Sequence, residues 1–320
     1  MISLEDVKLA QVRLRGVAFR TPLIPWSGEG SDRQLYFKPE SLQPVGAFKL
    51  RGAYNKIASL SGAERRRGVI AFSSGNHAQG VAYAARALGV RAVIVMPEAA
   101  PRVKRARTAA LGAQIDLVSG GGEEQWRSRA EALADEHGYV MVSPFNDETV
   151  IAGQATVGLE ILEDLPEVKA VLAPVGGGGL LSGVAAAVKL SRPGVRVIGV
   201  EPELANDAQA SFRSGQIVEL PLDQTRRTIA DGMRATRLGD IPFAHIRAFA
   251  DDILAVSEAE IREATRRLAL GARLIAEPSG AVAFAAFLFH RQELPEARGS
   301  VAVISGGNIA PETLAQILAE

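Results

Sequence analysis

The sequence predicts an α/β fold with mainly parallel sheets flanked by helices, and three observations favour this fold class. From residue 69 onward, short β-branched segments alternate with longer segments rich in Ala, Leu, Arg and Glu. Glycine follows several of the helical segments, and 47% of the 320 residues are hydrophobic, which allows a substantial core. Strands that alternate with helices are typical of parallel sheets, because parallel strands need long crossover connections.

The expected strands cover residues 69–72, 92–96, 115–118, 139–142, 171–175, 195–200, 253–256 and 301–304, and the expected helices 78–88, 103–111, 123–137 and 180–190. Gly89, Gly112 and Gly138 each follow one of these helices, where we expect the left-handed conformation that ends a helix without a Cβ clash. The apolar stretch 281–289 is about half of the ~18–20 residues that a membrane span needs, so it predicts a buried helix.

The composition excludes several classes of function. Lys and Arg number 36 and balance 36 Asp and Glu, so the charge gives no reason to expect a nucleic acid or an anionic membrane as partner. The absence of cysteine excludes disulfides, thiolate metal sites and a cysteine nucleophile. Residues 1–20 mix charges with apolar residues and lack the apolar stretch of a signal peptide, so we expect a cytoplasmic protein.

Four consecutive glycines, Gly176–Gly179, follow an expected strand and precede an expected helix. Backbone N–H groups can converge on an anion at such a position, so the run indicates a phosphate site, with a tight turn as the alternative. Leu180 and Leu181 fill the later spacing of a dinucleotide fingerprint, and no P-loop lysine follows. A nucleotide is therefore disfavoured.

A cluster of polar residues at 73–77 directly follows the first expected strand. In parallel sheets, ligands bind at this end of the strands, so the cluster indicates a binding site. A helix cap would explain one of these residues but not all of them.

Lys49 lies in a Phe-Lys-Leu context between Gly46 and Gly52. A lysine at a helix start can extend to water, which is the simpler interpretation. A desolvated lysine, by contrast, has a lowered pKa and becomes a nucleophile toward aldehydes.

Four segments, residues 44–53, 73–80, 176–179 and 305–308, occur in the order and spacing of the fold-type II pyridoxal-phosphate enzymes. The chain resembles their threonine/serine dehydratase and serine racemase branch nearly from end to end. The resemblance implies a two-domain fold similar to tryptophan synthase β, with residues 1–40 and 143–320 in a large cofactor domain and 41–142 in a small domain that closes on the substrate. It also implies a homodimer.

The resemblance also implies how pyridoxal 5'-phosphate is held. Lys49 would carry it as a Schiff base, Asn76 would bond its phenolic oxygen and Ser305 its pyridine nitrogen. A neutral hydroxyl does not favour protonation of that nitrogen, which encourages elimination over transamination. The other implied cofactor contacts are Phe48, Gly176, Gly177, Gly178, Gly179, Leu180, Gly232 and Glu277.

The substrate implied by the resemblance is a small hydroxy amino acid, with its carboxylate on the loop formed by Ser73, Ser74, Gly75 and His77. Ser74 would offer a second acid/base on the face opposite Lys49. Arg127 aligns with an arginine suited to a second substrate carboxylate, although a solvated arginine on the helix 123–137 is the alternative. Phe145, in a Pro-Phe-Asn-Asp stretch, resembles the dehydratases.

These features predict an ammonia-lyase that converts L-threonine or L-serine to a 2-oxo acid and ammonia by β-elimination. The alternative is a serine racemase or a 3-hydroxyaspartate dehydratase that uses Lys49 and Ser74 as opposite acid/bases. A non-catalytic amino-acid or cofactor-binding protein is a third possibility, and Lys49 argues against it.

The segment 201–207 resembles the metal loop of the serine racemase branch. There the Glu201 side chain, the Ala205 carbonyl and the Asp207 side chain would bind a hard cation. Oxygen ligands of this kind suit Mg²⁺ or Ca²⁺ in a structural role, and an acidic helix start is the alternative.

Overall fold

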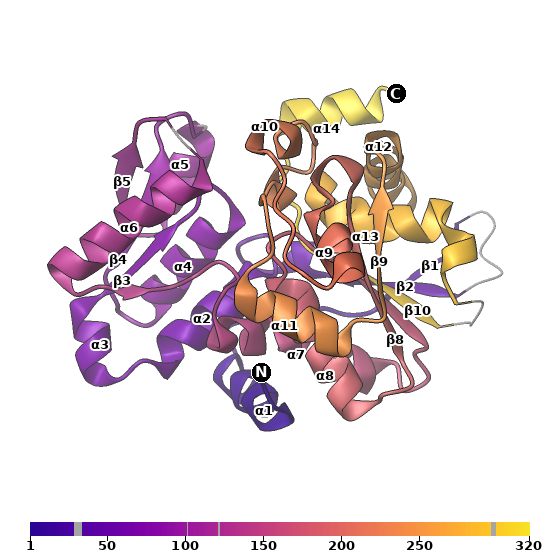
Figure 1. Ribbon diagram of the computed structural model, residues 1–320, viewed down its shortest axis with the longest axis horizontal. Helices are drawn as coiled ribbons and strands as arrows, with labels where there is room; N and C mark the ends of the chain where they lie inside the picture. Colours follow the sequence, from indigo (N-terminus) through magenta and orange to yellow (C-terminus); the bar gives the residue numbers. More distant parts are fainter. Residues whose placement is uncertain (29–33, 101, 121, 296–298) are drawn as a thin grey trace.

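The computed structural model describes residues 1–28, 34–100, 102–120, 122–295 and 299–320. Its strands form two mainly parallel sheets, and Figure 1 shows them in two lobes that lie side by side. Helices flank both sheets, which confirms the predicted fold class. Among the described helices, none is long and apolar enough to cross a membrane.

The smaller lobe contains a four-stranded sheet with the order β5-β4-β3-β6, in which every pair is parallel. Its strands are β3 (Val69–Phe72), β4 (Ala92–Pro97), β5 (Gln114–Val118) and β6 (Val140–Met141). Its helices are α2 (Lys49–Ser59), α3 (Gly62–Arg67), α4 (Asn76–Ala87), α5 (Arg102–Ala110) and α6 (Glu123–His137). These elements lie within the segment predicted for the small domain.

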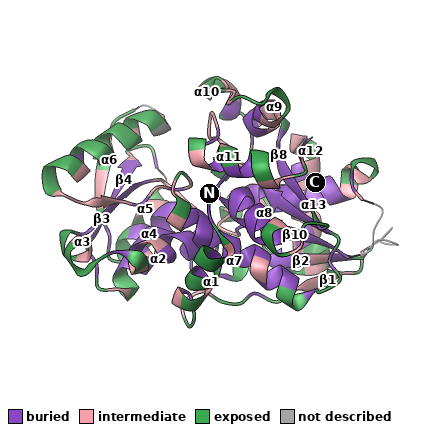
Figure 2. Ribbon diagram, turned by 60° about the horizontal axis from the view of Figure 1, so that its bottom comes forward, coloured by how far each residue is buried: buried purple, intermediate pink, exposed green. Residues whose placement is uncertain are grey.

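The larger lobe contains a six-stranded sheet with the order β1-β2-β10-β7-β8-β9, antiparallel only between β1 and β2. Its strands are β1 (Ile24–Trp26), β2 (Leu35–Pro39), β7 (Ala170–Pro174), β8 (Arg196–Pro202), β9 (Asp252–Val256) and β10 (Ser300–Ile304). Its helices are α1 (Leu4–Arg13), α7 (Glu148–Asp164), α8 (Gly179–Ser191), α9 (Asp207–Ser214), α10 (Leu222–Thr225), α11 (Asp240–Phe249), α12 (Glu258–Arg267), α13 (Pro278–Phe289) and α14 (Pro311–Leu318). Figure 2 shows α8 and α13 almost wholly buried, whereas α3 and α6 present exposed surface.

The eight predicted strands and the four helices predicted between them are present, with ends that differ by at most two residues. Gly89, Gly112 and Gly138 have φ of 65°, 93° and 72°, so the predicted left-handed helix ends are confirmed. The predicted buried helix at 281–289 is part of α13. The sequence analysis gave no ranges for the strands β1 and β2, nor for the helices α1, α2, α3, α7, α9, α10, α11, α12 and α14.

The helix α2 packs closely on α7, and α7 packs closely on α8, so α2 is joined to the larger lobe. A Cβ built on Gly153 of α7 would lie 2.6 Å from the Arg51 carbonyl oxygen and 2.6 Å from the Gly52 Cα. A Cβ on Gly183 of α8 would lie 2.6 Å from the Ile151 carbonyl oxygen. Glycine is therefore required at both positions for the backbones to approach this closely. The packing sets the position of α2, whose first residue is Lys49.

A buried ion cluster also fixes α2. The Arg51 guanidinium lies 2.7 Å from the Glu40 carboxylate and 2.6 Å from the Glu160 carboxylate, and Lys38 Nζ lies 2.6 Å from Glu160. The Lys38 ammonium also donates to the Thr21 carbonyl oxygen at 2.6 Å. Two cations and two carboxylates thus offset one another's charge, so none is buried unpaired.

Candidate active site

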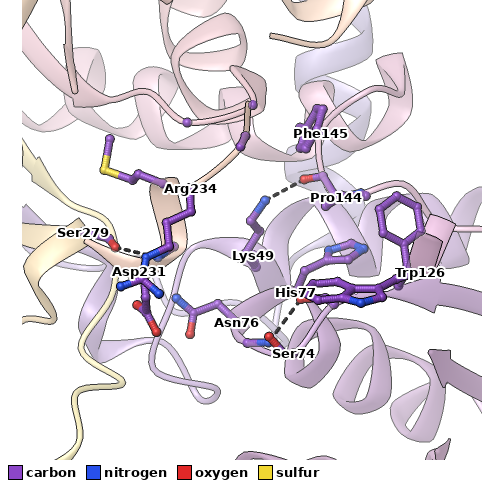
Figure 3. A pocket seen from close by; sticks show the side chains of 18 of the residues that line it. Lys49, Ser74, Asn76, His77, Trp126, Pro144, Phe145, Asp231, Arg234 and Ser279 are labelled. Carbon is purple, nitrogen blue, oxygen red and sulfur yellow. Dashed lines mark hydrogen bonds between the residues drawn. The ribbon is translucent and has the colours of Figure 1, made fainter. Parts of the chain in front are cut away.

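A cavity of about 690 Å³ lies between the two lobes. The loops that follow β3, β7 and β10 all contribute to it, as expected for the carboxyl ends of parallel strands. Figure 3 shows Lys49 between the Ser74–Asn76 segment and the Pro144–Phe145 segment. The predicted site residues that line the cavity are Phe48, Lys49, Ser73, Ser74, Gly75, Asn76, His77, Phe145, Gly176, Gly177, Gly178, Gly179, Leu180, Gly232, Glu277 and Ser305.

Lys49 extends into the cavity from the first turn of α2. Its Nζ donates a hydrogen bond of 2.6 Å to the Pro144 carbonyl oxygen and lies 5.1 Å from the centre of the Phe48 ring. The Phe48 N–H donates to the Ser305 carbonyl oxygen at 3.0 Å, and Ala47 forms a β-bridge with Gly306. The lysine segment is therefore tied to the loop that follows β10.

The glycine loop joins the end of β7 to the start of α8. Gly178 has φ of 96°, in the left-handed region that favours glycine. A Cβ on Gly177 would lie 2.4 Å from the Phe145 ring, so the loop has no room for a larger residue there. The N-terminus of the 13-residue helix α8 faces the same cavity. Backbone N–H groups and the helix dipole together make a site for an anion such as phosphate.

His77 fixes the loop that follows β3. Its Nε2 lies 2.8 Å from the Val142 carbonyl oxygen, which can only accept, so Nε2 carries the proton. The neutral ring leaves Nδ1 as an acceptor, and Nδ1 is buried without a hydrogen-bond partner among the described residues. Burial, and secondly the charge of Lys49, lower the pKa of His77 to about 3. His77 is therefore neutral at physiological pH and serves the loop's hydrogen bonding.

Asn76 belongs to a chain of side-chain amides that ends at Glu277. Asn308 donates from Nδ2 to the Val45 carbonyl oxygen and to Asn76 Oδ1, both at 2.8 Å. Asn76 Nδ2 donates to Glu277 Oε1 at 2.5 Å. Burial, and secondly the charge of Asp231, raise the pKa of Glu277 to about 7. Asn308 was part of a recognised segment, but sequence reasoning gave it no role.

Ser305 is buried at the end of β10, and its hydroxyl lies 3.4 Å from the Ser279 carbonyl oxygen. The Ser279 hydroxyl accepts a hydrogen bond of 2.9 Å from the Gly232 N–H. Next to Gly232, Asp231 forms an ion pair of 2.7 Å with Lys104 of α5. This ion pair joins the two lobes beside the cavity.

The structure does not place Arg127 in the cavity. Its exposed guanidinium donates to Glu124 on the same helix, at 2.6 Å to one carboxylate oxygen. The preceding residue, Trp126, lines the cavity instead. Successive helical side chains point in different directions, so neighbouring residues do not share a face. The prediction of Arg127 as a substrate residue therefore disagrees with this geometry.

The predicted metal loop brings two buried carboxylates together. Glu201 accepts from the Ala208 and Gln209 N–H groups at 3.1 and 2.6 Å, and Asp207 Oδ2 is buried without a partner among the described residues. Burial raises the pKa of Asp207 to about 8, and burial together with Asp207 raises that of Glu201 well above its usual range. No group of three or more Asp, Glu or His side chains is placed to hold a metal in the described part of the chain.

Comparison with known proteins identifies the family. Residues 14–306 match the family described as pyridoxal-phosphate dependent enzyme. The chain belongs to this family. An L-threonine ammonia-lyase of Thermotoga maritima is 45% identical, covering 99% of this chain and 78% of the relative. An L-threo-3-hydroxyaspartate ammonia-lyase of Saccharomyces cerevisiae is 43% identical over 98% and 95% of the two chains. Maize serine racemase superposes with a TM-score of 0.93 at 35% identity, covering 99% of this chain and 97% of that chain.

The protein is therefore a pyridoxal-phosphate-dependent enzyme of the threonine/serine dehydratase and serine racemase group. The cavity fits this cofactor. The glycine loop leaves a cradle that a Cβ would fill, and Lys49, Asn76 and Ser305 line the same space. Lys49 would hold the aldehyde carbon of the cofactor through its amine, and the N–H groups at the start of α8 would hold the phosphate.

Proposed function

We propose that the protein is an ammonia-lyase that converts L-threonine or L-serine to a 2-oxo acid and ammonia by β-elimination. The observation that carries the proposal is one cavity that holds an amine, a phosphate-type loop and a second anion site at the start of α4. The relatives named ammonia-lyases, at 43–45% identity, support the same reaction class.

Bound pyridoxal phosphate would supply an electron sink that makes the substrate Cα–H acidic. Lys49 Nζ would accept that proton, since α2 directs this amine into the cavity. The N–H groups of residues 73–77 would bind the substrate carboxylate at the start of α4. Ser305 would face the cofactor ring as a neutral hydroxyl, which favours elimination.

The test is 2-oxo-acid release from L-threonine and L-serine by the purified, cofactor-loaded enzyme. We expect turnover of at least one of them, and loss of turnover in Lys49→Ala with the fold retained. A loaded enzyme that turned over neither amino acid would contradict the proposal.

Serine racemisation is a second candidate, because Ser74 lines the same cavity as Lys49. In that case Ser74→Ala should abolish interconversion of serine enantiomers while sparing elimination from the L-enantiomer. Equal loss of both reactions would count against a separate acid/base role of Ser74.

We also propose that Glu201, Asp207 and the Ala205 carbonyl bind Mg²⁺ or Ca²⁺. Asp207 Oδ2 is buried beside Glu201 with no hydrogen-bond partner in the described part of the chain, which supports this proposal, because a cation would offset two buried carboxylates. Added cation should raise Tm after chelator treatment, and Asp207→Asn should remove that increase. No change in Tm would contradict the metal site and favour the alternative, in which the loop is only an acidic helix start.

Two further proposals rest on the sequence alone. We infer a homodimer, for which light scattering of the purified protein is the test. We also infer a cytoplasmic location, which fractionation of the source cells would test.

A further inference from the structure

We propose that the substrate side chain lies against an apolar wall centred on Trp126, and that the enzyme takes 3-hydroxy amino acids with an apolar substituent bulkier than a methyl group, such as 3-phenylserine. This inference rests on the proposed β-elimination. It specifies the substrate class of the same site.

The wall comes from both lobes. Phe72, Ala99, Ala100 and Trp126 contribute from the smaller lobe, and Leu222 and Ala235 from the larger one. A Cβ on Gly122 would lie 2.9 Å from Leu222 Cδ2, so the two parts of the wall meet. The cavity volume of about 690 Å³ falls within the range of ~300–1,000 Å³ that is common for sites of drug-sized ligands.

Packing holds Trp126 in this wall. The indole packs against the cluster of Phe72, Ile70 and Val95 on the smaller sheet, while part of it faces the cavity (Figure 3). Its Nε1 is buried without a hydrogen-bond partner among the described residues. Because this N–H is not exposed, the face that Trp126 offers to the cavity is apolar.

The charged groups around the wall do not favour a second substrate carboxylate. Arg127 points away and pairs with Glu124, and Lys104 pairs with Asp231. The Arg234 guanidinium donates to the Thr228 carbonyl oxygen at 2.6 Å. Arg226 also lines the cavity, so the experiment includes it. A carboxylate placed against Trp126 and Phe72 would lose its hydration without gaining an ion pair from α6.

The first experiment measures kcat/KM of the loaded enzyme for L-threonine, L-threo-3-phenylserine and L-threo-3-hydroxyaspartate. We expect kcat/KM for phenylserine to equal or exceed that for threonine. We expect kcat/KM for hydroxyaspartate to be at least ~10-fold lower than both, since ~10-fold is the low end of the discrimination that an apolar pocket provides. Trp126→Arg should lower the ratio of phenylserine to hydroxyaspartate at least ~10-fold. Arg127→Ala, the matched control on the next residue, should leave the ratio unchanged.

Turnover of threonine without phenylserine would overturn the inference and leave the proposed function standing. A preference for hydroxyaspartate that is lost in Arg226→Gln would also overturn it, and would identify Arg226 as a carboxylate partner. Turnover of none of these substrates, nor of serine, would remove the proposed function itself.

A binding measurement tests the wall without catalysis. The chain has two tryptophans, so Trp26→Phe leaves Trp126 as the single indole reporter. L-Phenylalanine and L-aspartate have no β-hydroxyl to eliminate. We expect L-phenylalanine to change the Trp126 emission with a Kd at least ~10-fold below that of L-aspartate. Equal affinities or the reverse order would overturn the inference, and Trp126→Phe should abolish the signal.

Discussion

The amide of Asn76 has a fixed orientation because Asn308 donates to its oxygen. Asn76 Nδ2 must then face Glu277 and the cavity, where it can donate to a bound ligand. Asn308 acts through Asn76, so it is a positioning residue. An amide pair fixed in this way presents a donor without reorganisation when a ligand binds.

We expect Asn308→Asp to weaken pyridoxal-phosphate binding by about 1–3 kcal/mol, since a carboxylate beside Asn76 Oδ1 would favour the flipped amide. Asn308→Ala, which removes the donor without adding an acceptor, should have a smaller effect. The measurement is the cofactor Kd of the apoenzyme by absorbance titration. Equal Kd values in both variants and the wild type would exclude the positioning role.

Glu277 should make the stability of the apoenzyme depend on pH. Its pKa in the folded protein is about 7, above the usual 4.5, chiefly because it is buried. Between these values the folded state binds a proton that the unfolded state has released. The stabilisation is therefore complete below about pH 4.5 and is lost as pH rises through about 7, with a total on the order of 3 kcal/mol.

Glu277→Gln should remove this dependence, so the Tm difference between wild-type and variant apoenzyme should change between pH 5 and pH 8. Thermal unfolding across that range gives the measurement. Parallel Tm profiles would show that Glu277 does not titrate in this window.

At the scale of elements, the contact of α2 with α7 should be sensitive to a single methyl group. Gly153→Ala would place a Cβ 2.6 Å from backbone atoms of α2, so the helix that carries Lys49 has to move. We expect a loss of about 1–3 kcal/mol in stability and a fall in kcat. Gly194→Ala is the matched control, because a Cβ there meets nothing within 4 Å. Urea unfolding and steady-state kinetics of both variants provide the comparison.

The strands were predictable where apolar residues rich in Val and Ile form buried runs, as in β3 and in residues 301–304 of β10. β2 lacked this signal because Lys38 lies inside it, and the charge of that buried lysine is offset by Glu160. β1 has three residues, one of them Pro25. The helix α1 did carry a signal, since Ser3 and Asp6 form a capping box.

At the scale of the whole molecule, the Lys104–Asp231 ion pair should favour the closed arrangement of the lobes. Its side chains are 29% and 43% exposed, so solvent screens the pair and it adds little to global stability. We expect Lys104→Gln to raise the substrate KM a few-fold with Tm nearly unchanged. Lys189→Gln, which breaks an ion pair within the larger lobe, should leave KM unaltered. Equal KM effects in the two variants would contradict a role in closure.

Much of the candidate site could be predicted because its segments follow strands, and parallel strands bring their carboxyl ends to one edge. Trp126 could not be identified, because the glycine run before α6 leaves the register of that helix undetermined and a shift of one residue exchanges Trp126 for Arg127. The link between Asn308 and Asn76 joins residues 232 positions apart, which local patterns do not report.

The buried cluster of Lys38, Glu40, Arg51 and Glu160 lies outside the set of residues that line the cavity. The helix that carries Lys49 is thus anchored by contacts that a departing cofactor leaves intact. The apoenzyme should therefore keep a preformed cofactor site that can take up synthetic cofactor analogues. Pyridoxal derivatives with a modified ring could then be bound by the same fold and give the enzyme new chemistry.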